Sequence, residues 1–190
     1  MACSHGIDIT KLWKIPPPMK GFQIQPALGQ WFVQYRVAPC SWAGSTEFQD
    51  YEYFASTGGK NAFSITLTMR NGICNTIKAP VFFTHQPGVM LVKDPLGNNF
   101  SGKLIYTAID YKSFQIIYVC TKMSVFGDKC DDALLSVQTR MVKPDGQTIA
   151  NINNALKGIF GVTVDQLQRV VHSKSCTQKQ TPFMPKSKWW

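Results

Sequence analysis

The chain has 190 residues, 44% of them hydrophobic, and a formal net charge of +9 at pH 7. The length suits one domain, and no stretch reaches the roughly 18 apolar residues that a membrane-spanning helix needs. The basic charge would suit a nucleic-acid partner, but the lysines are scattered along the chain and no nucleic-acid-binding motif is present. We therefore expect no nucleic-acid partner and no transmembrane segment.

Residues 1–28 are predicted to be irregular, because three consecutive prolines at 16–18 fit neither a helix nor a central strand. From residue 29 to about residue 142, short β-branched and aromatic runs alternate with turn signals, and no helix intervenes. This order is typical of an antiparallel sandwich or barrel. Strict alternation over 63–69 places the apolar residues of that strand on one face. Further strands are predicted at 103–108, 113–120 and 133–141, with turns at 70–72, 85–88, 94–99, 110–112 and 127–128.

One helix is predicted at about 146–160. Asp145 is a suitable N-cap, and Gly158 and Gly161 are stop signals. The polar face is rich in Asn and Gln rather than Lys and Arg, so we expect the helix to pack on the sheet and not on a membrane. A short strand near 166–171 follows, and the polar, basic tail at 177–190 is expected to be mobile. The apolar positions at helical spacing are Ile149, Ile152, Leu156 and Ile159.

The cysteines indicate an oxidising compartment. There are six of them, spread along the chain, which suits three disulfides in a secreted protein. No C-x-x-C pair is present, so we expect neither a zinc ribbon nor a thioredoxin-like site. No apolar signal segment follows Met1, and we interpret the sequence as a mature extracellular chain with an added initiator methionine; a cytosolic protein is the alternative. The cysteines are Cys3, Cys40, Cys74, Cys120, Cys130 and Cys176.

Three short motifs, in order, resemble those of the lipocalin family. Gly29-Gln30-Trp31 opens the first strand and resembles the G-x-W motif, and Ile109-Asp110-Tyr111 resembles T-D-Y, with Ile in place of Thr. Arg140 ends the last long strand, where lipocalins have an arginine. The resemblance covers about residues 20–176. It implies an all-β fold in which 29–176 form an eight-stranded antiparallel up-and-down barrel with one C-terminal α-helix.

The second half is similar to the retinol-binding protein, apolipoprotein D and bilin-binding branch. The likeness is carried by Tyr118-Val119-Cys120, Cys130, Arg140, Pro144-Asp145-Gly146 and Val170-Val171-His172. It implies the disulfides Cys120–Cys130 and Cys74–Cys176, which would leave Cys3 to pair with Cys40. The insect bilin-binding lipocalins imply a different pairing, Cys40–Cys176 and Cys3–Cys120. The sequence alone does not choose between them.

The motif residues are expected to be structural. An aromatic side chain at Trp31 would fill the closed end of a small barrel. The guanidinium of Arg140 could stack on that indole, a contact worth about 1 kcal/mol. Asp110 is expected to accept hydrogen bonds from backbone amides of its own tight turn, which also contains Tyr111.

An eight-stranded barrel has room for one small ligand, and alternation predicts that Trp31, Val33 and Tyr35 share a side of the first strand. The resemblance extends this set over the other strands and places Ser136 and Gln138 inward, where the retinol-binding branch has aromatic residues. That difference implies a wider or more polar lower cavity. A core filled by the same apolar residues is the alternative. The expected ligand-binding residues are Val33, Tyr35, Phe63, Ile65, Leu67, Met69, Ile77, Val81, Met90, Val92, Leu104, Tyr106, Ile117, Leu134, Ser136 and Gln138.

The resemblance implies a secreted carrier of a hydrophobic molecule: a retinoid, carotenoid, bilin, sterol or fatty acid. We expect no required cofactor, no metal site and no enzymatic activity, since no catalytic motif is present. The alternative is an interaction or scavenger lipocalin, in which the loops or the basic tail bind a partner. In that case the cavity could take an amine, through Glu47, Asp50 or Glu52, or a haem, through His85. A homodimer or a carrier partner also stays open.

Overall fold

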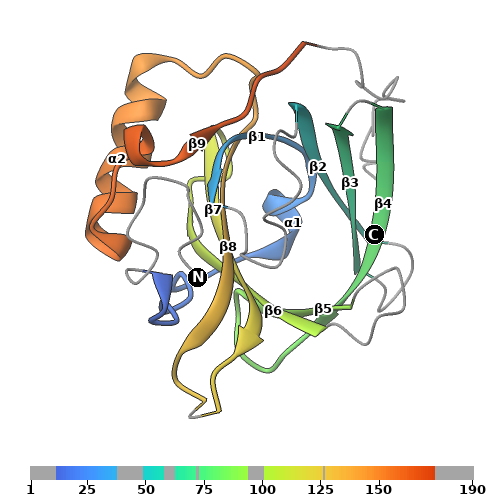
Figure 1. Ribbon diagram of the computed structural model, residues 1–190, viewed down its shortest axis with the longest axis vertical. Helices are drawn as coiled ribbons and strands as arrows, with labels where there is room; N and C mark the ends of the chain where they lie inside the picture. Colours follow the sequence, from blue (N-terminus) through green and yellow to red (C-terminus); the bar gives the residue numbers. More distant parts are fainter. Residues whose placement is uncertain are drawn as a thin grey trace, which may run out of the picture.

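The computed structural model describes residues 12–37, 49–57, 63–71, 73–93, 101–125 and 127–173. These residues form an antiparallel sheet and one long helix (Figure 1). No helix in these ranges is long and apolar enough to cross a membrane. The strands are β1 (Gly29–Val37), β2 (Gln49–Thr57), β3 (Phe63–Asn71), β4 (Ile73–Phe83), β5 (Val89–Lys93), β6 (Ser101–Ile109), β7 (Phe114–Met123), β8 (Cys130–Thr139) and β9 (Gln168–Arg169), and the helices are α1 (Ile24–Ala27), α2 (Gly146–Phe160) and a single 3-10 turn, Val164–Gln166.

The strand β1 joins the two ends of the sheet. Consecutive strands from β2 to β8 pair with one another, and β1 pairs with β2 through its first residues and with β8 from Phe32 onward. The strands β1 to β8 therefore form a ring in which every strand has two neighbours, and Figure 1 shows them curving around a common interior. The predicted all-β antiparallel fold with a C-terminal helix is confirmed.

Several predicted turns join the strands as expected. The turn at 85–88 joins β4 to β5, 110–112 joins β6 to β7, and Gly127 lies in the hairpin between β7 and β8 with a φ of 76°. A positive φ is easy for glycine, which has no Cβ. The predicted turn at 94–99 lies outside the described residues.

The helix α2 begins and ends where the sequence predicts. The Asp145 carboxylate accepts a hydrogen bond from the Thr148 amide at 2.7 Å, and Gly161 ends the helix in the left-handed conformation. The buried side chains of α2 contact the outer face of the ring in what we call the outer cluster. Figure 1 shows α2 outside the sheet, near β9 and β7. Members of the outer cluster are Leu12, Val37, Val89, Ile105, Phe114, Ile116, Tyr118, Cys120, Cys130, Leu135, Val137, Ile152, Leu156, Phe160, Val162, Val164 and Leu167.

The disulfide predicted between Cys120 and Cys130 is confirmed. It joins β7 to β8 across their hairpin, with 5.6 Å between the two Cα atoms. This pairing excludes the alternative in which Cys120 pairs with Cys3. Cys74 is also disulfide-bonded. Its predicted partner Cys176, and the predicted pair Cys3–Cys40, involve residues outside the described ranges.

The segment before β1 differs from the irregular stretch that the prolines predict. It contains the four-residue helix α1 and is fastened to the sheet by backbone hydrogen bonds. The Cys130 amide donates to the Trp13 carbonyl and the Met19 amide donates to the Tyr106 carbonyl, each at 2.8 Å. The Tyr118 hydroxyl donates to the Leu12 carbonyl at 2.7 Å. An extended, proline-rich backbone has free carbonyls and amides, and here strand edges and loops satisfy several of them.

Replacing Leu156 by Ala should lower the free energy of unfolding by about 2–5 kcal/mol, because it opens a cavity beneath α2 where this side chain is fully buried. Asn154 lies on the exposed side of the same helix, so Asn154→Ala should change the value by no more than about 0.5 kcal/mol. Urea unfolding followed by circular dichroism, with the disulfides intact, measures both. Equal effects of the two variants would show that α2 is not part of the core.

Candidate functional site

The interior of the ring has its own buried cluster, separate from the outer one. Its members come from α1 and from six strands distributed around the ring: β1, β2, β4, β5, β6 and β7. Along β7 the two clusters alternate: Ile116 and Tyr118 belong to the outer one, and Ile117 and Val119 contact the inner one. This is the alternation expected of a strand with both faces buried. The buried members of this inner cluster are Ala27, Trp31, Ala55, Val81, Met90, Leu104, Tyr106, Ile109 and Ile117.

One end of the interior is closed by Trp31 and Arg140. The indole of Trp31 is completely buried, and its Nε1 donates to the Ala27 carbonyl of α1 at 2.9 Å. The guanidinium carbon of Arg140 lies 3.5 Å from the centre of the Trp31 ring, which is the predicted cation–π contact. The same guanidinium donates to the carbonyls of Gln30 and Pro26, each at 2.9 Å. Arg140 therefore ties the end of β8 to the start of β1 and to α1.

The end of the interior that Trp31 and Arg140 close is called the floor of the barrel. Gly29 is required at this floor for two reasons. Its φ is +94°, a backbone conformation that residues other than glycine rarely adopt. A Cβ at this position would also lie 3.3 Å from Nη1 of Arg140. The glycine of the G-x-W motif thus leaves room for the guanidinium to lie close to the backbone at the start of β1 and, at the same time, to cover Trp31.

The electrostatics of the floor depend on Arg140 and Asp110. Burial lowers the pKa of Arg140 to about 10, and the Asp110 carboxylate, followed by Tyr106, opposes that shift. Burial also raises the pKa of Asp110, but hydrogen bonds from Ser113, Phe114 and Lys112 outweigh it, so the pKa lies below the ordinary value. Both groups are therefore charged at neutral pH, which suits a structural role.

The turn between β6 and β7 is organised by the Asp110 carboxylate. Its Oδ1 accepts from the amides of Lys112, Ser113 and Phe114 at 3.0, 2.7 and 2.9 Å, and the Ser113 hydroxyl donates to Oδ2. Tyr111 has a positive φ of 65°, and its hydroxyl accepts from the Gln23 amide at 2.9 Å. The turn therefore holds the segment that leads into α1, through the contact between Tyr111 and Gln23.

Most of the described residues that the sequence assigns to the ligand site lie on the inner face. Val81, Met90, Leu104, Tyr106 and Ile117 belong to the inner cluster, and Val92 packs against it. Val33 is fully buried and pairs with Gln138, while Leu134 pairs with Val119. Cross-strand partners share a face of the sheet, so these residues also face inward. The side chains of Phe63, Ile65, Leu67, Met69 and Ile77 lie outside the described part of the structure.

The prediction for Tyr35 is wrong, because β1 has a bulge at Gln34. The pairing with β8 shifts between Val33 and Tyr35, and Tyr35 packs against the outer cluster. The side chain of Gln34 donates to Thr139 Oγ1 at 3.0 Å and to the Met141 carbonyl at 3.1 Å. One extra residue in a strand reverses which later side chains face inward.

The bulge brings Arg36 to the inner face instead. Arg36 pairs with Ser136 of β8 and with Gln168 of β9, and its side chain is 1% exposed. Its Nε donates to Gln168 Oε1 at 3.2 Å. Sequence reasoning missed this residue because an arginine in a predicted strand is normally assigned to the solvent side.

A polar row crosses the inner face of β7 and β8 near the floor. Gln115 Nε2 donates to Gln138 Oε1 at 2.6 Å, and Gln138 Nε2 donates to Ser136 Oγ at 2.9 Å. All three side chains are buried. The inward positions of Ser136 and Gln138 agree with the prediction of a more polar lower cavity. Gln115 was missed, although the alternation with Ile117 could have identified it.

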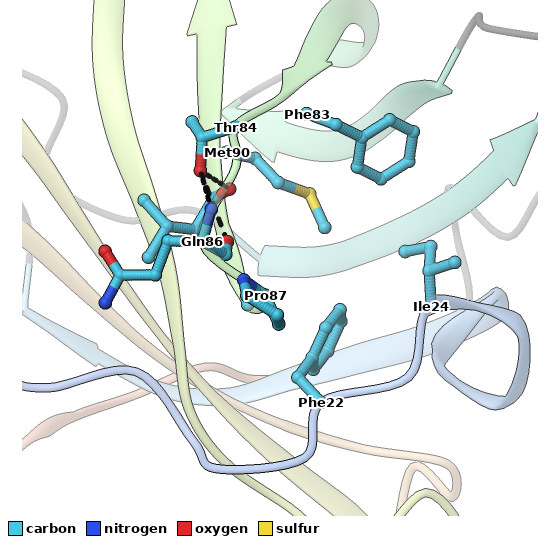
Figure 2. Close-up of a pocket in the computed structure, with 9 residues that line it drawn as sticks. Phe22, Ile24, Phe83, Thr84, Gln86, Pro87 and Met90 are labelled. Atoms are coloured by element: carbon cyan, nitrogen blue, oxygen red, sulfur yellow. Dashed lines mark hydrogen bonds between the residues drawn. The ribbon is translucent and has the colours of Figure 1, made fainter.

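A pocket of about 160 Å³ lies at the same end of the ring, between α1 and the β4–β5 turn. Figure 2 shows Phe22, Ile24, Phe83 and Met90 around it, with Pro87 at one side. The Thr84 hydroxyl holds the turn by donating to the Val89 carbonyl at 2.8 Å, and the same oxygen accepts from the Gln86 amide at 3.2 Å. The phenyl ring of Phe22 stacks on Tyr106 at 4.4 Å, which links the pocket wall to the inner cluster. The volume of this pocket suits a few non-hydrogen atoms rather than a whole lipid.

Replacing Asp110 by Asn should destabilise the protein at pH 7, by about 1 kcal/mol, because the charged acceptor of the turn is lost from a partly exposed site. A carboxyl with a lowered pKa stabilises the folded state above its ordinary value of 3.8, and this contribution disappears as the pH falls through the lowered pKa. The difference between Asp110→Asn and the parent chain should therefore narrow below pH 3.8. Thermal unfolding from pH 7 to pH 2 measures it, and a difference that is constant with pH would contradict the assignment.

No family model matches the chain, and no curated protein matches it in sequence. Among solved structures, the crystal structure of Per a 4, described as one of the major allergens from cockroaches, is similar with a TM-score of 0.66 and 14% sequence identity. The match covers 86% of this chain and 96% of that chain. At this identity the likeness establishes the fold alone, and the retinol-binding branch stays a prediction. The chain has the lipocalin fold.

Proposed function

We propose that the protein binds and carries a small hydrophobic molecule inside the barrel. The observation that carries this proposal is the separation of the two buried clusters. The outer cluster, with α2, supplies a conventional core, while the inner cluster lines a closed ring of strands and is covered at one end by Trp31 and Arg140. An eight-stranded barrel is the size that holds one small ligand.

The ligand class follows from the lining. Apart from Arg36 and the polar row, the described walls are aliphatic and aromatic. A ligand that buried about 300 Å² of apolar surface there would gain roughly 7–8 kcal/mol before the costs of immobilisation. We propose a retinoid, carotenoid, bilin, sterol or fatty acid. The polar row at Gln115, Gln138 and Ser136 argues against strict retinol specificity, because the retinol-binding branch has aromatic residues at two of these positions.

The proposed setting is extracellular. The disulfide Cys120–Cys130 and the bonded Cys74 suit an oxidising compartment. We propose a binding protein and not an enzyme: Asp110 and Arg140, the charged groups at the floor, both serve as structural contacts. Retention of a hydrophobic molecule needs no cofactor.

Native mass spectrometry and a visible absorption spectrum of the protein from its natural source test the proposal. We expect an additional mass of a few hundred daltons, or an absorption band. If the protein is isolated without ligand, retinol, biliverdin and a fatty acid should be titrated while Trp fluorescence is followed. Absence of binding to all three would contradict the carrier proposal.

Filling the interior should abolish binding. Ile117→Trp adds a large ring to the inner face, so it should raise the dissociation constant of the best ligand by at least about tenfold, while the secondary structure is retained. Met141→Trp is the matched control, because Met141 is 67% exposed and should leave binding unchanged. If Ile117→Trp prevents folding and the parent chain binds nothing, the interior is a filled core.

A further inference from the structure

The polar row contains an acceptor that the chain itself does not satisfy. Gln115 is 0% exposed, and its Nε2 is committed to Gln138. Its Oε1 is buried and has no hydrogen-bond partner within the part of the chain that the structure describes. A buried carbonyl oxygen without a donor is unfavourable, and most such groups in native proteins have a partner.

This acceptor lies deep in the barrel. Gln115 is the second residue of β7, directly after the turn at the closed end, and it pairs with Gln138, which in turn pairs with Val33. Val33 is two residues from Trp31, so the row stands about one side-chain layer above the floor. Gln115 also pairs with Ile109 of the inner cluster.

Above the row, Arg36 of β1 lies at the level of Ser136, and the inner wall formed by β6, β7 and the adjoining part of β8 is apolar. Ile117 follows Gln115 on the inner face of β7, and Val119 and Leu134 form the next inward cross-strand pair. Leu104 contributes to the same face from β6, where it pairs with Val119. A molecule that lies along this wall therefore meets a polar surface at its deep end and an apolar surface along its body.

We propose that the ligand is an amphipathic alcohol that enters with its hydroxyl first and donates that hydroxyl to Gln115 Oε1. The inference rests on the proposed carrier function and adds the polarity and the orientation of the ligand. A neutral hydroxyl fits better than an ammonium group. Among the residues that the structure describes, the acceptor left without a donor here is the neutral amide oxygen of Gln115. Desolvation of a full charge against a neutral amide costs more than one hydrogen bond returns.

The test compares two ligands that differ only in the donor. 1-Decanol and its methyl ether have the same apolar chain, but the ether has no hydroxyl hydrogen. Their dissociation constants can be measured by displacement of a fluorescent anilinonaphthalene sulfonate probe. We expect the alcohol to bind the parent chain about tenfold more tightly than the ether, the ratio that one buried hydrogen bond of ordinary strength produces.

Two variants connect this ratio to the residue. Gln115→Leu should bring the ratio to within about twofold of one, mainly by weakening the alcohol. Ile117→Val is the matched control: it removes one methylene from the same face of β7, so it should weaken both ligands alike and leave the ratio unchanged. Thermal unfolding confirms that each variant is folded, and Gln115→Met, closer in shape to glutamine, replaces the leucine variant if that one is not folded.

The outcomes separate this inference from the proposed function. Equal binding of alcohol and ether to the parent chain would overturn the inference and leave the carrier function standing, with buried water as the donor to Oε1. Tightest binding of decylamine would overturn the hydroxyl assignment. If none of the four ligands decanol, its methyl ether, retinol and a fatty acid bound to the parent chain, the carrier function and the inference would both fail.

Discussion

The bulge at Gln34 determines which side chains of β1 face the interior of the barrel. Before it, Trp31 and Val33 face inward; after it, Arg36 faces inward, and Tyr35 and Val37 turn toward the outer cluster. The bulged residue is itself held on two sides. Its side chain binds the end of β8, and its carbonyl accepts from the Val170 amide at 2.8 Å. The chain after α2 is therefore attached to β1 at the point where β1 changes register.

The closed end is made of segments that are distant in sequence. Arg140 reaches the carbonyls of Gln30 and Pro26 while its guanidinium covers Trp31, and the Asp110 turn beside it binds the segment before α1 through Tyr111. Each contact needs the others in place. The guanidinium has enough carbonyl acceptors only when α1 and the start of β1 lie beneath it, and Gly29 leaves the space that this requires. This interdependence explains how three weak motifs can specify one structural unit.

Much of this fold could be predicted from the residues. Alternation of period two identified β3, and β-branched and aromatic runs between turn signals identified β6, β7 and β8. Helical spacing together with Asp145 and Gly161 defined α2. The resemblance identified Trp31 and Arg140, and the chemistry of an indole and a guanidinium predicted their contact. The bulge could not be predicted, because one extra residue leaves the local composition unchanged and acts only through pairing with β8. For that reason Tyr35 was assigned to the wrong face and Arg36 was not considered. The attachment of residues 12–28 depends on backbone hydrogen bonds to partners far along the chain, such as Tyr106, and side-chain patterns carry no record of these.

The position of α2 outside the ring has a consequence for how this protein can change. Its apolar side chains join those of the outward-facing strand positions, so much of the stabilising apolar burial lies in a layer outside the proposed binding cavity. Inner positions such as Leu104 and Ile117 are then free to vary in size and polarity at a smaller risk to the fold. Such an arrangement favours rapid divergence of specificity on a constant scaffold, and it makes the inner wall a suitable place to randomise when a new binding protein is wanted.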